Sequence, residues 1–92
     1  MTSERSTAYG RVMRTLAELG PAKLHDAEAA IVRDAADTLL FAVLPQDPAA
    51  IEAITLVERL MLDLVEVERW APESAQRLAD DVAACGPALA VA

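Results

Sequence analysis

The chain has 92 residues, of which 54% are hydrophobic and 3% aromatic, and its formal net charge is -7. This length suffices for one domain around one core, and a core of Ala, Leu, Val and Ile favours helices. The negative charge disfavours direct binding to nucleic acids or anionic membrane surfaces, because phosphate groups attract Lys and Arg. We predict an all-α protein, a small four-helix bundle formed by residues 1–92, with 1–4 and 88–92 as candidates for flexible ends.

The sequence also bears on the compartment. Its N-terminal residues lack the apolar run of a signal peptide, and no segment reaches the ~18 uncharged apolar residues that a membrane span needs. The single cysteine, Cys85, cannot form a disulfide within the chain, although a disulfide between two chains stays open. We therefore expect a cytoplasmic protein with no membrane partner.

The first predicted helix runs from about Glu4 to Leu19, where Gly20 followed by Pro21 stops it. It is the basic helix of the chain, with Arg5, Arg11 and Arg14. We expect it to pair with a neighbour that carries carboxylates.

The second predicted helix spans roughly Lys23 to Val43 and is ended by Pro45, which cannot continue a helix. Its apolar positions define a broad buried side. Phe41 is out of phase, because its position in the turn places it on the polar side with Asp34 and Asp37.

The third predicted helix, about 48–70, has the clearest start, with Asp47 placed to cap it and Pro48 in its first turn. Its apolar positions cover roughly half the circumference, so we expect more than one neighbour to cover it and a central place in the bundle. They are Ala53, Ile54, Leu56, Val57, Leu60, Met61, Leu64, Val65 and Val67. A fourth helix follows from Pro72 to the stop at Gly86-Pro87, and the sequence leaves its packing direction open.

Chemistry-bearing motifs are scarce. His25 and Glu28 form one H-x-x-E pair, but zinc and di-iron sites need further His, Cys or carboxylate ligands from facing elements. The chain shows no Gly-rich phosphate loop and no nucleophile motif. We predict no catalytic, cofactor or metal site and no enzyme activity, with a metal-binding helical protein as the weakest alternative.

Out-of-phase apolar residues are the main functional signal. Phe41, Ile51 and Leu62 fall on or beside polar faces, and Trp70 lies at a helix junction. Such a set favours a contact surface, although packing under the loops or the apolar 88–92 tail would equally explain it. We predict a protein–protein interaction or self-association module, with another protein or a second copy as the partner.

An acidic inhibitor that imitates the charge of nucleic acid, as anti-restriction proteins do, is the second hypothesis. It requires one continuous negative surface formed by Asp26, Asp34, Asp37, Asp63 and Glu66. Interspersed arginines such as Arg33 and Arg59 argue against it, because they interrupt the acidic stripes.

Overall fold

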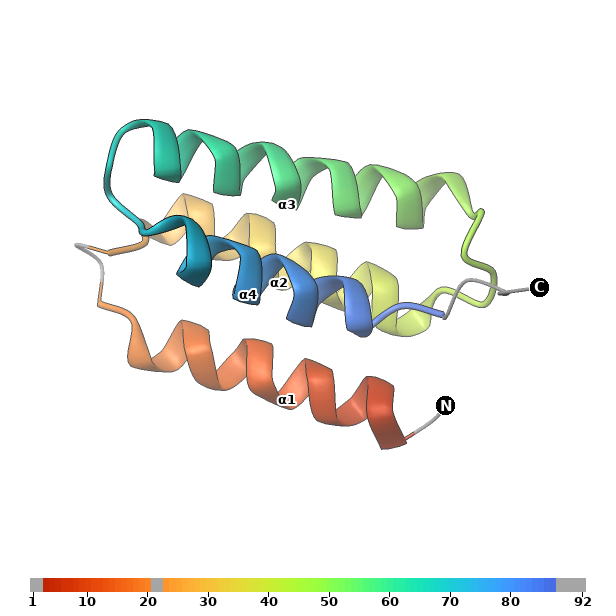
Figure 1. The fold of residues 1–92 in the computed structure, drawn as a ribbon. Helices are drawn as coiled ribbons and strands as arrows, with labels where there is room; N and C mark the ends of the chain where they lie inside the picture. Colours follow the sequence, from red (N-terminus) through yellow and green to blue (C-terminus); the bar gives the residue numbers. More distant parts are fainter. Residues whose placement is uncertain (1–2, 21–22, 88–92) are drawn as a thin grey trace.

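The computed structural model describes residues 3–20 and 23–87 and contains four helices within them (Figure 1). They are α1 (Ser3–Glu18), α2 (Asp26–Phe41), α3 (Pro48–Glu66) and α4 (Pro72–Ala84). No strand occurs in the described ranges, so the prediction of an all-α, four-helix protein is confirmed. Of the predicted flexible ends, Ser3 and Glu4 are helical, whereas 1–2 and 88–92 lie outside the described residues.

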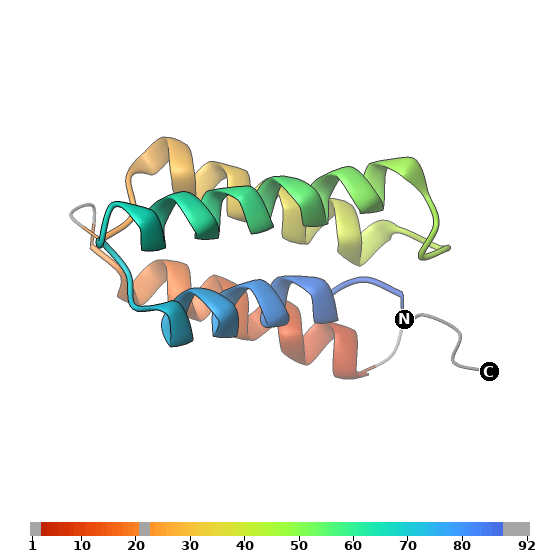
Figure 2. The same cartoon turned by 45° about the horizontal axis from the view of Figure 1, so that its top comes forward.

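Successive helices run in opposite directions, with their axes roughly along the long dimension of a 38 × 22 × 21 Å molecule (Figure 1). Turning the molecule shows two layers, α2 with α3 and α1 with α4 (Figure 2). Helix α4 therefore folds straight back along α3. Within the described residues α1 and α3 do not touch, whereas α2 and α4 each contact all three other helices.

The wide apolar stripe predicted for the third helix is divided between two neighbours. Five inward residues of α3 enter the core, namely Ala50, Ala53, Val57, Met61 and Leu64. Because only α2 and α4 pack on this helix, further apolar residues stay in solvent: Leu56 and Val67 at one edge of the stripe, and the out-of-phase Ile51 and Leu62 beyond its other edge. These edges are where a further contact can form.

Two helix ends differ from the predicted bounds by three residues or more, and the second helix also ends at Phe41 and not at Val43. The second helix begins three residues later than Lys23, because the backbone N–H groups of Lys23 and Leu24 donate to Gly20 O (3.0 and 3.1 Å) in a turn of their own. The third helix ends at Glu66 rather than at Trp70, because Glu68 adopts a left-handed conformation with φ 60°. The backbone N–H of Glu68 then donates to Val65 O and that of Arg69 to Leu64 O, both at 3.0 Å, which is the bond pattern of a Schellman cap.

The cap predicts a stabilising substitution. Left-handed backbone is unfavourable for a residue with a Cβ, and glycine adopts it freely. We expect Glu68→Gly to raise the free energy of unfolding by up to about 1 kcal/mol, since part of the gain is offset by the greater entropy of glycine in the unfolded chain. Urea titration followed by far-UV circular dichroism measures this change, and Glu58→Gly, at an exposed position in the interior of α3, should destabilise instead.

The C-termini of α2 and α4 converge on one arginine of α1. The Arg5 guanidinium donates from Nε to Cys85 O (2.9 Å) and from Nη2 to Leu39 O (2.8 Å) and Ala42 O (2.9 Å). Gly86 lies so close to this junction that a Cβ there would be 3.0 Å from Leu39 Cδ2. Arg5 thus supplies donors to carbonyl groups at the C-terminal ends of both helices, where the regular intrahelical bonding pattern runs out.

Candidate functional site

A groove runs along the surface between α3 and α4 and has a volume of about 340 Å³. From α3 it is lined by Ile54, Glu58, Met61, Leu62 and Val65. From α4 it is lined by Pro72, Ala75, Gln76, Ala79, Asp80 and Ala83. We call this feature the α3–α4 groove.

The α3 wall carries the exposed apolar residues. Leu62 has 69% of its surface exposed although it borders apolar neighbours on the groove side of the helix. Ile51, 52% exposed, precedes it by eleven residues, which is close to three full helical turns. Ile51 therefore lies on the same side of α3 and extends the apolar wall by one turn beyond Ile54.

The α4 wall is built from small side chains. Ala75, Ala79 and Ala83 recur every fourth residue and so lie above one another on one face of the helix. The structure buries Ala75, but it leaves Ala83 exposed and Ala79 half-buried along the groove.

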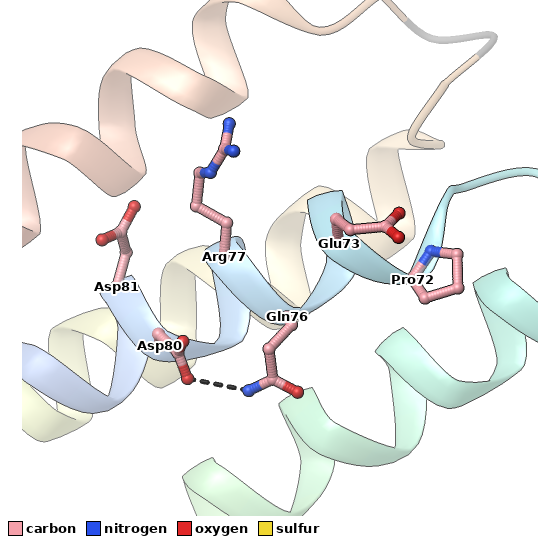
Figure 3. Close-up of a pocket in the computed structure, with 6 residues that line it drawn as sticks. All are labelled: Pro72, Glu73, Gln76, Arg77, Asp80 and Asp81. Atoms are coloured by element: carbon pink, nitrogen blue, oxygen red, sulfur yellow. Dashed lines mark hydrogen bonds between the residues drawn. The ribbon is translucent and has the colours of Figure 1, made fainter.

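Two side chains form the outer rim of the α4 wall. Figure 3 shows Gln76 and Asp80 directed toward α3, with the Gln76 amide donating to Asp80 Oδ1 at 2.8 Å. Arg77 and Asp81 are directed the other way, toward α1. There Arg11 Nε donates to Asp81 Oδ1 at 3.0 Å, the kind of pairing between the basic helix and a carboxylate that we expected.

The charge of the groove has one sign. The ionisable side chains that line it are Glu58 on α3 and Asp80 on α4, and no lysine or arginine is among its described lining residues. Both carboxylates belong to exposed residues. The α3–α4 groove therefore combines mostly apolar walls with one carboxylate on each wall.

Phe41 does not belong to the groove. It is 77% exposed and points away from the bundle, on the side of α2 opposite the buried Val32, Ala36 and Leu39. Val43 and Leu44, which follow α2, are exposed as well, although the second helix was predicted to continue through Val43. Because α2 ends at Phe41, Val43 lies in the loop and not on the buried side predicted for the apolar positions of this helix.

Trp70 is placed differently from the contact role predicted for it. Only 9% of its surface is exposed, and its indole Nε1 donates to Lys23 O at 2.7 Å. The early end of α3 turns Trp70 back into the core, where it joins the buried cluster. This burial within its own chain removes Trp70 from the residues available to a partner.

Beside Trp70, the H-x-x-E pair has a structural arrangement. Arg69 donates to both carboxylate oxygens of Glu28 at 3.0 Å, and the backbone N–H of His25 donates to Glu28 Oε1 at 2.8 Å. His25 Nδ1 lies 3.5 Å from the same oxygen. Residues 3–20 and 23–87 contain no group of three or more His, Cys, Asp or Glu side chains that could hold a metal ion.

This arrangement predicts a pH dependence. The hydrogen bonds from Arg69, together with the weaker effect of the His25 backbone N–H, lower the pKa of Glu28 below the 4.5 that is usual for a glutamate. Because the folded-state pKa is the lower one, the stabilisation is present above about pH 4.5 and is lost as the pH falls through the folded-state pKa. We expect Glu28→Gln to lower the free energy of unfolding at neutral pH. The difference in this free energy between the variant and wild type should shrink at an acidic pH, and urea unfolding at neutral and at acidic pH measures it. An unchanged difference would contradict the arrangement.

Cys85 and Tyr9 lie close to the Arg5 junction. The Cys85 side chain is fully buried, and burial raises the pKa of its thiol to about 11. Tyr9 Oη donates a short hydrogen bond to Asp37, which raises the tyrosine pKa. Asp37 is thus half-buried and hydrogen-bonded within the chain. The other four acidic residues of the charge-imitation hypothesis, Asp26, Asp34, Asp63 and Glu66, are exposed.

No protein-family model, curated protein or solved structure matches this chain. Among the described residues, none of the helices has the length and apolar character required to cross a membrane.

Proposed function

We propose that this protein is a non-catalytic interaction module that contacts its partner through the α3–α4 groove. The observation that carries the proposal is the position of Leu62. A large apolar side chain, 69% exposed, stands on the wall of a groove whose other lining residues are mostly apolar. Contiguous exposed apolar surface of this kind marks contact sites more often than scattered apolar residues do.

Ile51 and Phe41 support the proposal to different degrees. Ile51 continues the apolar wall along the same side of α3, so it is assigned to the contact surface with Leu62. Phe41 lies on the outward side of α2 and is not needed for contact in the groove.

Site-specific photo-crosslinking tests this proposal in the cells that naturally make the protein. A benzophenone amino acid replaces Leu62 in one variant and the neighbouring Asp63 in the control. Both positions are exposed, but adjacent helical residues point about 100° apart, so only position 62 faces the groove. We expect a discrete cross-linked product from position 62 and none from position 63.

Mass spectrometry of the product identifies the class of partner. A cross-link to a second copy gives twice the mass of the chain and only peptides of this sequence, whereas a cross-link to another protein gives peptides of a second sequence. Leu62→Glu, combined with a photo-reactive residue at Ile51, should abolish the product while leaving the free energy of unfolding within about 0.5 kcal/mol of wild type. The absence of a product at position 62, or equal products at 62 and 63, would refute the proposed contact surface.

A further inference from the structure

We infer that the α3–α4 groove binds an amphipathic helix of another protein, whose apolar stripe is flanked by Lys or Arg. This inference rests on the proposed function and specifies the partner of the same site. It follows from the length of the groove, the size of its side chains and the sign of its charge.

The dimensions of the groove suit a helix. Its α3 wall extends from Ile54 to Val65 and its α4 wall from Pro72 to Ala83, eleven residues of rise in each case. At about 1.5 Å per residue each wall is about 16 Å long, or three helical turns. A partner helix of that length would present apolar side chains at positions i, i+3 or i+4, i+7 and i+11.

The side chains also favour a helix. Apart from Pro72, every apolar residue of the α4 wall is an alanine, which allows a partner backbone to approach closely. The α3 wall supplies the larger Ile54, Leu62 and Val65, which can pack between the side chains of the incoming helix. The low α4 wall and the higher α3 wall together form a surface on which the apolar stripe of a partner helix can pack.

The carboxylates of the groove favour a partner helix with basic residues beside its apolar stripe. Glu58 stands on one wall and Asp80 on the other, so a bound helix would lie between two carboxylates. Basic residues on both sides of its apolar stripe would meet them, whereas acidic residues would be repelled. The net charge of -7 also attracts a basic partner at longer range, which should speed its association with the groove.

A second copy of this chain fits less well. In a two-fold symmetric contact each groove meets the same groove, which would gather two Glu58 and two Asp80 carboxylates in one seam. The basic residues nearest in sequence to Glu58 and Asp80 cannot neutralise these four carboxylates. Arg59 points about 100° around α3 from Glu58, and Arg77 is directed toward α1 (Figure 3).

Two synthetic peptides of about 18 residues test the inference with the full chain. Both carry the same leucine stripe, and its flanking positions are lysine in one and glutamate in the other. Fluorescence anisotropy of labelled peptide measures binding at low and high salt. We expect the lysine peptide to bind at least about tenfold more tightly at low salt and to lose most of this advantage at high salt. Its amide chemical-shift changes in the protein should map to residues 54–65 and 72–83.

Charge reversal sharpens the test. Glu58→Lys with Asp80→Lys should reverse the preference in favour of the glutamate peptide. Glu52→Lys with Asp63→Lys changes the net charge equally at exposed positions outside the groove and should preserve the preference for the lysine peptide. Leu62→Glu should weaken binding of the lysine peptide at least about tenfold.

Failure of the inference can be separated from failure of the proposed function. Equal binding of the two peptides, no binding of the lysine peptide, or shifts that map elsewhere would overturn the basic-helix partner. So would a cross-link from position 62 to a second copy, although that result would uphold the groove as a contact surface. The absence of any cross-link from position 62 would refute the proposed function itself.

Discussion

Arg5→Met is expected to lower the free energy of unfolding by about 2–4 kcal/mol, because hydrogen bonds to charged groups contribute about 1.5–3 kcal/mol each and several are lost together. The guanidinium bonds Cys85 O near the end of α4 and Leu39, Leu40 and Ala42 O at the end of α2. Methionine retains much of the aliphatic packing but none of the donors. The carbonyls at both helix ends would then lose their side-chain partner.

Matched variants separate this effect from a general loss of charge. Arg14→Met removes the same charge from an exposed position of α1 and should change stability by less than about 0.5 kcal/mol. Arg5→Lys keeps the charge but cannot reach the same spread of acceptors with one ammonium group, so we expect an intermediate loss. Urea unfolding followed by circular dichroism gives all three values. Equal stability of Arg5→Met and wild type would show that the junction contributes nothing.

Trp70→Ala is expected to lower the free energy of unfolding by about 3–5 kcal/mol, as removal of a large core side chain does. It leaves a cavity where the end of α1 meets the junction between α3 and α4, and it removes the hydrogen bond to Lys23 O. Trp70→Phe keeps most of the ring volume and loses the indole donor, so it should cost about 1–2 kcal/mol.

Phe41→Ala provides the contrast. Sequence reasoning grouped Phe41 with Trp70, but Phe41 is exposed and Trp70 is buried. We expect Phe41→Ala to change stability by less than about 0.5 kcal/mol. Comparable losses for Phe41→Ala and Trp70→Ala in the same unfolding measurement would contradict the placement of these two side chains.

Much of the fold follows from local sequence signals. The Gly20-Pro21 and Gly86-Pro87 pairs, Pro45 and Pro72 divide the chain into the four observed helices. Asp47 caps α3 as its position predicts, with Oδ1 accepting from the Ala49 backbone N–H at 2.9 Å. Helical phase also placed Phe41, Ile51 and Leu62 on the outside, where the structure has them. These features depend on residues within a few turns of one another.

The tertiary structure decided the features that join distant segments. Arg5 and Cys85 are 80 residues apart in sequence, and no local pattern marks Arg5 as a helix cap. The turn at Glu68 is held by backbone hydrogen bonds although its left-handed residue is not a glycine, and it brings Trp70 into the core. Likewise, Glu58 and Asp80 line one groove only because α4 folds back along α3. Periodicity determines which side of a helix is apolar, but the neighbour that covers that side depends on contacts across the whole chain.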